Sequence, residues 1–186
     1  MRILIMAVPW DMDRVRNAKR LSEQTGGDIV WDRTKNIMDT FVSVLDEAGD
    51  DAALVLQDDV QLRDDWHPMA TQAVEEHGEM LIQFFSIRAS DVGRESYRNN
   101  ASGYMMNQCY YLPPGMAADL AEYARAWIEE HPGHTGDDTC IQDYLKHRRM
   151  HYWHHVPSLV QHRTWPSATG KGRSTRRQSP TFEEKA

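Results

Sequence analysis

Short apolar runs and longer amphipathic stretches alternate along the first 56 residues of the chain. The apolar runs at 3–8, 28–31 and 52–56 are typical of buried strands. The two stretches between them have the period of helices. The first begins at the capping residue Asp11, and the second ends at Gly49. Strands and helices that alternate in this way form right-handed βαβ units, so the pattern predicts a parallel sheet.

The rest of the chain continues this pattern with longer connections. The segment 86–103 has no period and is rich in Arg, Asn, Ser and Gly, which indicates a functional or disordered loop. The predicted fold class is α/β, with three layers, a mostly parallel central sheet and one antiparallel strand. The further strands are expected at 80–85, 107–112 and 151–156, and the further helices from Asp64 or Asp65 to Glu76, after Pro113, and from about Asp137.

The chain has the composition of one globular domain followed by a tail. Almost no core residues follow Pro166, so 1–166 is predicted as a single domain and 167–186 as a flexible basic tail. No run approaches the roughly 18 apolar residues that span a bilayer, and the first apolar run is too short for a signal peptide. Two unpaired cysteines suit a reducing compartment. We therefore expect a cytoplasmic protein that is not inserted in a membrane.

The formal net charge of −7 excludes a protein that is cationic over its whole surface, but two local basic groups stand out. The group at 146–149 suits the end of a helix, where the helix dipole favours cations. The second group lies at 171–177 in the predicted tail. Both groups could instead follow a nucleic-acid backbone, so a non-enzymatic nucleic-acid-binding module is one alternative function.

Two adjacent carboxylates, Asp58 and Asp59, follow the apolar run 52–56 directly. Ligands of open α/β sheets bind beyond the carboxyl ends of the strands, where this pair is expected to lie. Adjacent like charges repel each other. A hard cation such as Mg²⁺ or Mn²⁺ holds carboxylate oxygens together and keeps substrate phosphates as further ligands. A solvated turn, in which Asp is common, is the alternative interpretation.

Three stretches resemble one family of enzymes. The segment Val-Leu-Gln-Asp-Asp-Val at 55–60 resembles the strand-then-acid motif of GT-A glycosyltransferases, especially those of the lipopolysaccharide-biosynthesis family. The segment 156–162 resembles one that ends in a metal-binding histidine in related phage and bacterial enzymes. The stretch 167–182 resembles the flexible tail that closes over the nucleotide diphosphate in those enzymes. The resemblance follows nearly the whole chain in order, but only these three stretches are distinctive.

This resemblance implies a GT-A (Rossmann-like) fold and a transfer of sugar from a nucleotide diphosphate sugar to an acceptor hydroxyl. Mn²⁺ or Mg²⁺ would hold the diphosphate. Asp59 is implied as the direct metal ligand, Asp58 as a ligand of the metal or the donor ribose, and His162 as the second protein ligand. Gln57 stands where the family often has an acid, so we expect a lower metal affinity.

Donor contacts are implied at the ends of the first two strands and in the tail. For Asp32, an N-cap turn is an equally good interpretation. The basic tail residues would neutralise the diphosphate leaving group, as Arg and Lys do on transferring phosphates. The residues implied in donor binding are Ala7, Val8, Pro9, Asp32, Lys35, Asn36, Asp58, Lys171 and Arg177.

Asp137 and Asp138 follow a glycine-rich break at 133–136. The family has an acid at this place, which accepts the proton of the acceptor if the reaction inverts configuration. A carboxylate can act as a general base when it lies within hydrogen-bond reach of the hydroxyl. It can also cap a helix and favour its dipole. We assign Asp137 to the cap and Asp138 to the base.

The acceptor, the reaction class and the role of the histidines each have more than one interpretation. The resemblance leans toward phage-encoded enzymes in the host cytoplasm, whose acceptors include hydroxymethylated pyrimidines in DNA, virion proteins and glycans. A metal-dependent phosphohydrolase or nuclease could use the same Asp58, Asp59 and His162. Of the nine histidines, only His162 is singled out, because His154 and His155 point to opposite faces of a strand and no His-Glu-x-x-His motif is present. We expect most of the others at the surface.

Overall fold

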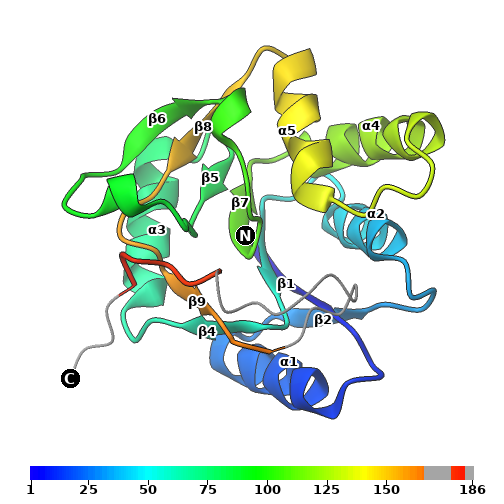
Figure 1. The fold of residues 1–186 in the computed structure, drawn as a ribbon, viewed down its shortest axis with the longest axis horizontal. Coiled ribbons are helices and arrows are strands. Elements are labelled where there is room, and N and C mark those ends of the chain that lie inside the picture. The colour runs from blue at the N-terminus through cyan, green and yellow to red at the C-terminus, as the bar shows by residue number, and fades with distance from the viewer. Residues whose placement is uncertain (166–176, 183–186) are drawn as a thin grey trace.

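A seven-stranded sheet forms the centre of the computed structural model, which describes residues 1–165 and 177–182 (Figure 1). Pairing of neighbouring strands shows that β7 and β6 run antiparallel to the other five. The predicted α/β sandwich with a mostly parallel sheet is therefore confirmed, but it has two antiparallel strands rather than one. The strands in sheet order are β2 (Asp28–Trp31), β1 (Arg2–Ala7), β3 (Ala53–Gln57), β7 (Cys109–Leu112), β5 (Ile82–Gln83), β8 (His151–His154) and β6 (Tyr97–Asn100).

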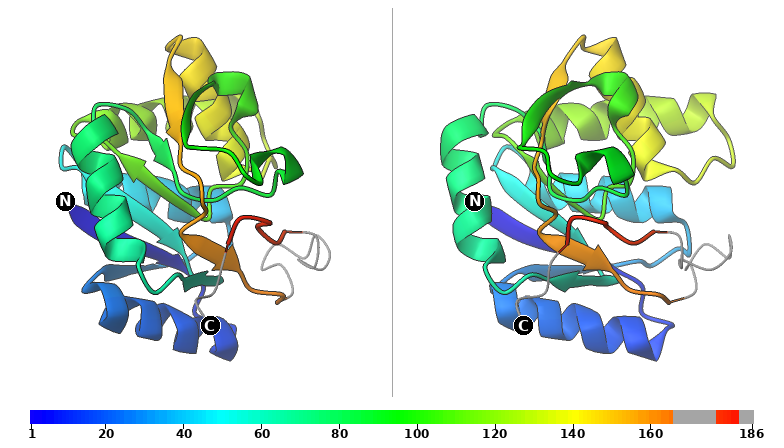
Figure 2. Two further views of the ribbon diagram at one scale, coloured as in Figure 1. Left: turned by 90° about the vertical axis from the view of Figure 1, so that its left-hand side faces the viewer. Right: turned by 60° about the vertical axis from the view of Figure 1, so that its left-hand side comes forward.

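Helices cover both faces of the sheet, as the views in Figure 2 show. The apolar side chains of β1 alternate between two cores, because successive strand residues point to opposite faces. Leu4 and Met6 pack with α2, α4 and α5, whereas Ile5 and Ala7 pack with α1 and α3. No helix among the described residues is long and apolar enough to cross a bilayer. The helices are α1 (Met12–Thr25), α2 (Ile37–Ala48), α3 (Trp66–His77), α4 (Met116–Glu130) and α5 (Asp137–His147).

A small second sheet was not expected from the sequence. It pairs β4 (Val60–Leu62) with β9 (Val160–His162) in antiparallel register, with Val60 opposite His162. The backbone N–H of Arg163 also donates to the carbonyl oxygen of Asp59 over 2.7 Å. This pairing carries His162 to the end of β3, beside the predicted acidic pair.

Residues 177–182 belong to the predicted flexible basic tail and lie along β9 (Figure 2). The rest of that tail lies outside the described part of the chain. Ser179 and Thr181 are buried. The hydroxyl of Ser179 lies 2.8 Å from that of Ser158, and the Ser158 N–H donates to the Thr181 hydroxyl over 3.0 Å. The described residues 177–182 are therefore anchored to β9 and to Ser158.

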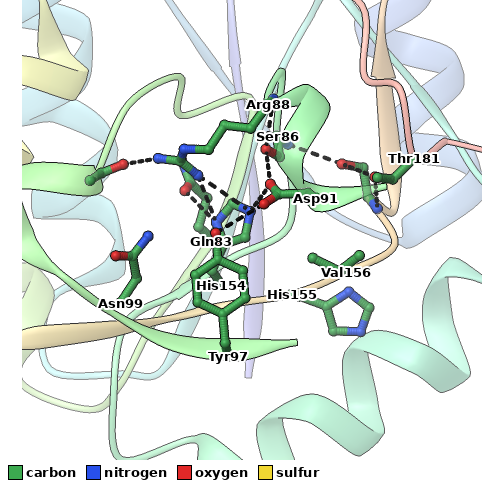
Figure 3. A network of polar contacts seen from close by, with 12 residues as sticks. Gln83, Ser86, Arg88, Asp91, Tyr97, Asn99, His154, His155, Val156 and Thr181 are labelled. Carbon is green, nitrogen blue, oxygen red and sulfur yellow. Dashed lines mark hydrogen bonds and ion pairs between the residues drawn. The ribbon is translucent and has the colours of Figure 1, made fainter. Parts of the chain in front are cut away.

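A buried polar network fixes the segment that the sequence indicated as an aperiodic loop (Figure 3). The carboxylate of Asp91, in the 3-10 helix η1 (Ala89–Asp91), accepts hydrogen bonds from the hydroxyls of Ser86 and Tyr97. His154 Nε2 lies 2.9 Å from the same carboxylate. Both His154 and His155 are buried: polar partners that include Asp91 satisfy His154, and the Pro157 carbonyl accepts from His155.

Replacing Asp91 with Ala should lower the free energy of unfolding by about 3 kcal/mol, because it leaves the buried Ser86 and His154 and the half-buried Tyr97 without their shared partner. Urea denaturation of the variant beside wild type measures the difference. Ser90→Ala, at the exposed neighbouring position, serves as the control. A change below about 0.5 kcal/mol, the usual range of a surface substitution, would show that the network does not stabilise the fold.

Candidate functional site

A cavity of about 610 Å³ opens beyond the carboxyl ends of β1, β2 and β3. Open α/β sheets bind their ligands at this place. The start of α5 and the segment 106–108 form further parts of its wall. Pro9 and His162 are not among the lining residues, and Lys171 lies outside the described part of the chain. The predicted site residues that line the cavity are Ala7, Val8, Asp32, Lys35, Asn36, Asp58, Asp59, Asp137, Asp138 and Arg177.

The acidic pair is held by helix α1, which sequence analysis did not connect to the site. The guanidinium of Arg14 bridges the two carboxylates, with Nη1 on Asp58 Oδ1 and Nη2 2.9 Å from Asp59 Oδ2. The backbone N–H of Val8 donates to Asp58 Oδ2 over 2.8 Å. The amide of Asn17 donates to the carbonyl oxygens of Asp58 and Val60. Residues of α1 and of the segment after β1 thus fix the turn that follows β3.

The environments of the two carboxylates differ. Burial raises the pKa of Asp58 above its usual range, and the lowering effects of Arg14 and the Val8 N–H do not fully offset it. Burial also acts to raise the pKa of Asp59, but contacts with His162 and Arg14 outweigh it and leave that pKa lowered. Asp59 is therefore the member of the pair that stays ionised most readily, which suits a ligand of a cation.

His162 and Asp59 lie where a divalent cation would bind both. His162 Nδ1 lies 2.6 Å from the carbonyl oxygen of Arg163, which can only accept, so Nδ1 donates to it and Nε2 is the ring atom that a cation would bind in place of a proton. Nε2 is 3.3 Å from Asp59 Oδ2. Two neighbouring ligands, each about 2.1 Å from one ion, span a similar distance. Metal-binding histidines commonly fix their other ring N–H on a carbonyl in this way.

A second observation at Asp59 also indicates that a cation fits this site. Its other oxygen, Oδ1, is buried and has no hydrogen-bond partner among the described residues. A buried carboxylate oxygen without a partner is costly, and a cation would satisfy it. Within the described residues, no group of three or more His, Cys, Asp or Glu side chains could hold a metal ion. The residues therefore fit a partial site, in which water or phosphate oxygens complete the coordination.

The structure corrects one of the roles predicted for Asp137 and Asp138, the helix cap. Gly136 is the N-cap of α5 and no side chain caps the helix, so Asp137 is not the cap. Asp137 is buried at the cavity wall, and burial, with the nearby charge of Asp138, raises its pKa to about 7. Both carboxylates accept backbone N–H groups: Asp137 accepts that of Asp138, and Asp138 accepts those of Met106 and Thr139. The identity of the base stays a prediction.

The donor side of the cavity combines fixed backbone with an exposed aromatic ring. Asp32 Oδ1 accepts the N–H groups of Thr34 and Lys35, and Asn36 caps α2. Asp32 thus stabilises the turn, as its alternative interpretation proposed, and it also lines the cavity. Trp10, which sequence analysis missed, is 42% exposed at the cavity, with Lys35 Nζ 5.6 Å from its ring centroid.

No protein-family model and no curated protein sequence matches the chain. Among solved structures, it is similar to one described as the crystal structure of A197 from STIV, with a TM-score of 0.47 and 12% identity over 87% of this chain and 84% of that chain. It is also similar to the UTP-bound UGPase from Acinetobacter baumannii, with a TM-score of 0.42 and 9% identity over 92% of this chain and 73% of that chain. At such values neither similarity assigns a function.

Proposed function

We propose that the protein is a metal-dependent glycosyltransferase, which moves a sugar from a nucleotide diphosphate sugar to an acceptor hydroxyl. One observation carries the proposal: basic side chains and a buried carboxylate line a single cavity at the carboxyl ends of β1, β2 and β3, and Asp59 in its wall contacts His162 to form a partial cation site. The volume of about 610 Å³ lies in the range of small-molecule sites, which is about 300–1,000 Å³. Such a reaction needs a cation for the leaving diphosphate, positive charge for the phosphates and a base for the acceptor hydroxyl, and these three features would supply them.

On the donor side, Asp59 and His162 would hold Mn²⁺ or Mg²⁺, with Asp58 beside them. The ion, when bound, supplies Lewis-acid stabilisation of the charge that develops on the leaving diphosphate. Lys35 and Arg177 line the same cavity and add positive charge for the phosphates. The exposed face of Trp10 offers a stacking surface for the nucleotide base, since aromatic rings stack on any base.

On the acceptor side, Asp137 would take the proton from the attacking hydroxyl if the reaction inverts configuration. Burial raises its pKa to about 7, which matches a base that works near neutral pH. Gln57 Nε2, 3.5 Å from Asp137 Oδ2, connects this carboxylate to the end of β3. The neutral Gln57 thus lies between the proposed base and the acidic pair, and an acid at this position would add a further carboxylate to these three.

A panel of nucleotide sugars with Mn²⁺ tests this function, with release of the nucleoside diphosphate as the signal. Acceptors in the panel should include DNA with hydroxymethylated pyrimidines, glycans and proteins. We expect release that depends on one donor and increases with one acceptor. Turnover of a phosphodiester without any sugar donor would indicate a phosphohydrolase or nuclease instead. DNA binding that survives Asp59→Asn, with no donor turnover, would indicate a nucleic-acid-binding module.

Arg177→Gln should raise the KM for the donor about tenfold and leave thermal stability unchanged, because a charged hydrogen bond to phosphate contributes about 1.5 kcal/mol and Arg177 lines the cavity. Steady-state kinetics with varied donor concentration measures the effect. Arg98→Gln, on the exposed surface of β6, is the control. An unchanged donor KM together with weaker binding of the acceptor would place Arg177 in the acceptor site.

A further inference from the structure

The buried guanidinium of Arg14 occupies one side of the carboxylate that the metal needs. We propose that Arg14 competes with the divalent ion for Asp59, so that the ion binds weakly until a diphosphate enters the cavity. The proposal rests on the metal site of the proposed function, and it makes Arg14 a positioning residue that couples metal binding to donor binding.

The competition follows from the contacts of a single oxygen atom. Asp59 Oδ2 lies 2.9 Å from Arg14 Nη2 and 3.3 Å from His162 Nε2. An ion shared by Oδ2 and the histidine would therefore lie close to the guanidinium. The side chain of Arg14 is 5% exposed, so water screens the repulsion between the two cations only weakly. The ion must displace Arg14 from this oxygen or bind with its charge nearby.

The charges of the buried Arg14, Asp58 and Asp59 side chains also predict weak binding of the ion. Arg14 neutralises one of the two carboxylates and leaves a net charge of −1 for a divalent ion. Affinity for hard cations depends on the charge of the ligand set, so this site is a weak one on its own. A diphosphate adds anionic oxygens that can contact both the ion and the guanidinium. Binding of the ion and of the diphosphate then strengthen each other, and this coupling is reciprocal.

The position of Arg14 explains why the protein keeps a cation at this place. Arg14 and Asn17 lie on the buried face of α1 with Ala18 and Leu21, and both polar residues contact the turn after β3. Without a cation, two adjacent buried carboxylates would repel each other and destabilise the turn. Arg14 therefore keeps the site assembled when no metal is bound.

The test compares Arg14→Gln with wild type and with Arg16→Gln, a control on the exposed face of the same helix. Calorimetric titration with Mn²⁺ alone at pH 8 should show about tenfold tighter binding to Arg14→Gln than to wild type. Without metal, Arg14→Gln should unfold at a lower temperature, and Mn²⁺ should raise its Tm by more than it raises that of wild type. Arg16→Gln should behave as wild type. A merely structural role for Arg14 predicts the opposite, weaker metal binding in the variant.

A measurement on wild-type protein does not depend on how the variant folds. Mn²⁺ and inorganic pyrophosphate together should raise its Tm by more than the sum of their separate effects. Additive effects in wild type, or Mn²⁺ affinity in Arg14→Gln equal to or below that of wild type, would overturn the proposal. These measurements need no sugar donor. A protein that shows the competition but turns over no nucleotide sugar would refute the proposed function and leave the role of Arg14 standing.

Discussion

Asp59→Asn is expected to reduce sugar transfer by about a thousandfold in a protein that stays folded. Asp59 supplies both the buried oxygen without a partner and the oxygen that faces His162. Asparagine keeps the shape of the side chain but removes its negative charge, so the ion loses its main protein ligand. Asn is preferred to Ala here, because truncating one member of a buried ion pair costs about 3–5 kcal/mol of stability. Arg14 keeps Asp58 as its partner in the variant.

Measurement of kcat at saturating donor and Mn²⁺, together with thermal unfolding, separates the loss of chemistry from the loss of fold. His162→Ala should reduce transfer in the same way, because it removes the second protein ligand. Asp64→Asn, at an exposed carboxylate beyond β4, is the matched control and should retain full activity. Near wild-type turnover by Asp59→Asn would show that Asp59 does not bind the metal.

The βαβ part of the fold and the place of the strand-end acids were predictable from local sequence. Helix α1 begins after Asp11, whose side chain accepts the N–H groups of Asp13 and Arg14, and it ends at Gly26 with a φ of 69°. Such capping signals lie within a few residues of the features that they predict. Parallel strands end at one edge of their sheet, so acids that follow β2 and β3 reach a common cavity.

The features that were missed depend on contacts between distant segments. Strands β4 and β9 have three residues each, and β6 is a polar edge strand, so none has a hydrophobic pattern of its own. Arg14 was missed because charged residues are seldom buried without a partner, and its partners lie on another element. Its place on one helical face with Ala18 and Leu21 was the available signal. Adjacent acids such as Asp137 and Asp138 give no sequence signal for which of them is buried.

Asp137→Asn is expected to lower kcat by about 10²–10⁴, the usual contribution of a general base. In wild type the carboxylate must be ionised to accept a proton, so the rate should rise with pH around the Asp137 pKa of about 7 and then level off. The residual rate of Asp137→Asn should lack this rise. Asp138→Asn, which changes the acid tied to the backbone of Met106 and Thr139, should keep the wild-type pH profile. If Asp138→Asn lost this rise and Asp137→Asn kept it, Asp138 would be the base.

Asp137→Asn should also be more stable than wild type at pH 8. This second effect separates a proton-exchanging group from a structural one. The pKa of Asp137 rises from a reference value of 3.8 to about 7 in the folded protein, mainly through burial. Between these values the folded state keeps a proton that the unfolded state has lost, so wild-type stability falls as the pH rises through this window. Asparagine has no such cost and should gain on the order of 2 kcal/mol at pH 8, with no gain near pH 4. Urea denaturation at both pH values, without metal, measures this difference. A variant that loses activity and stability together at pH 8 would show that Asp137 supports the fold instead of acting as the base.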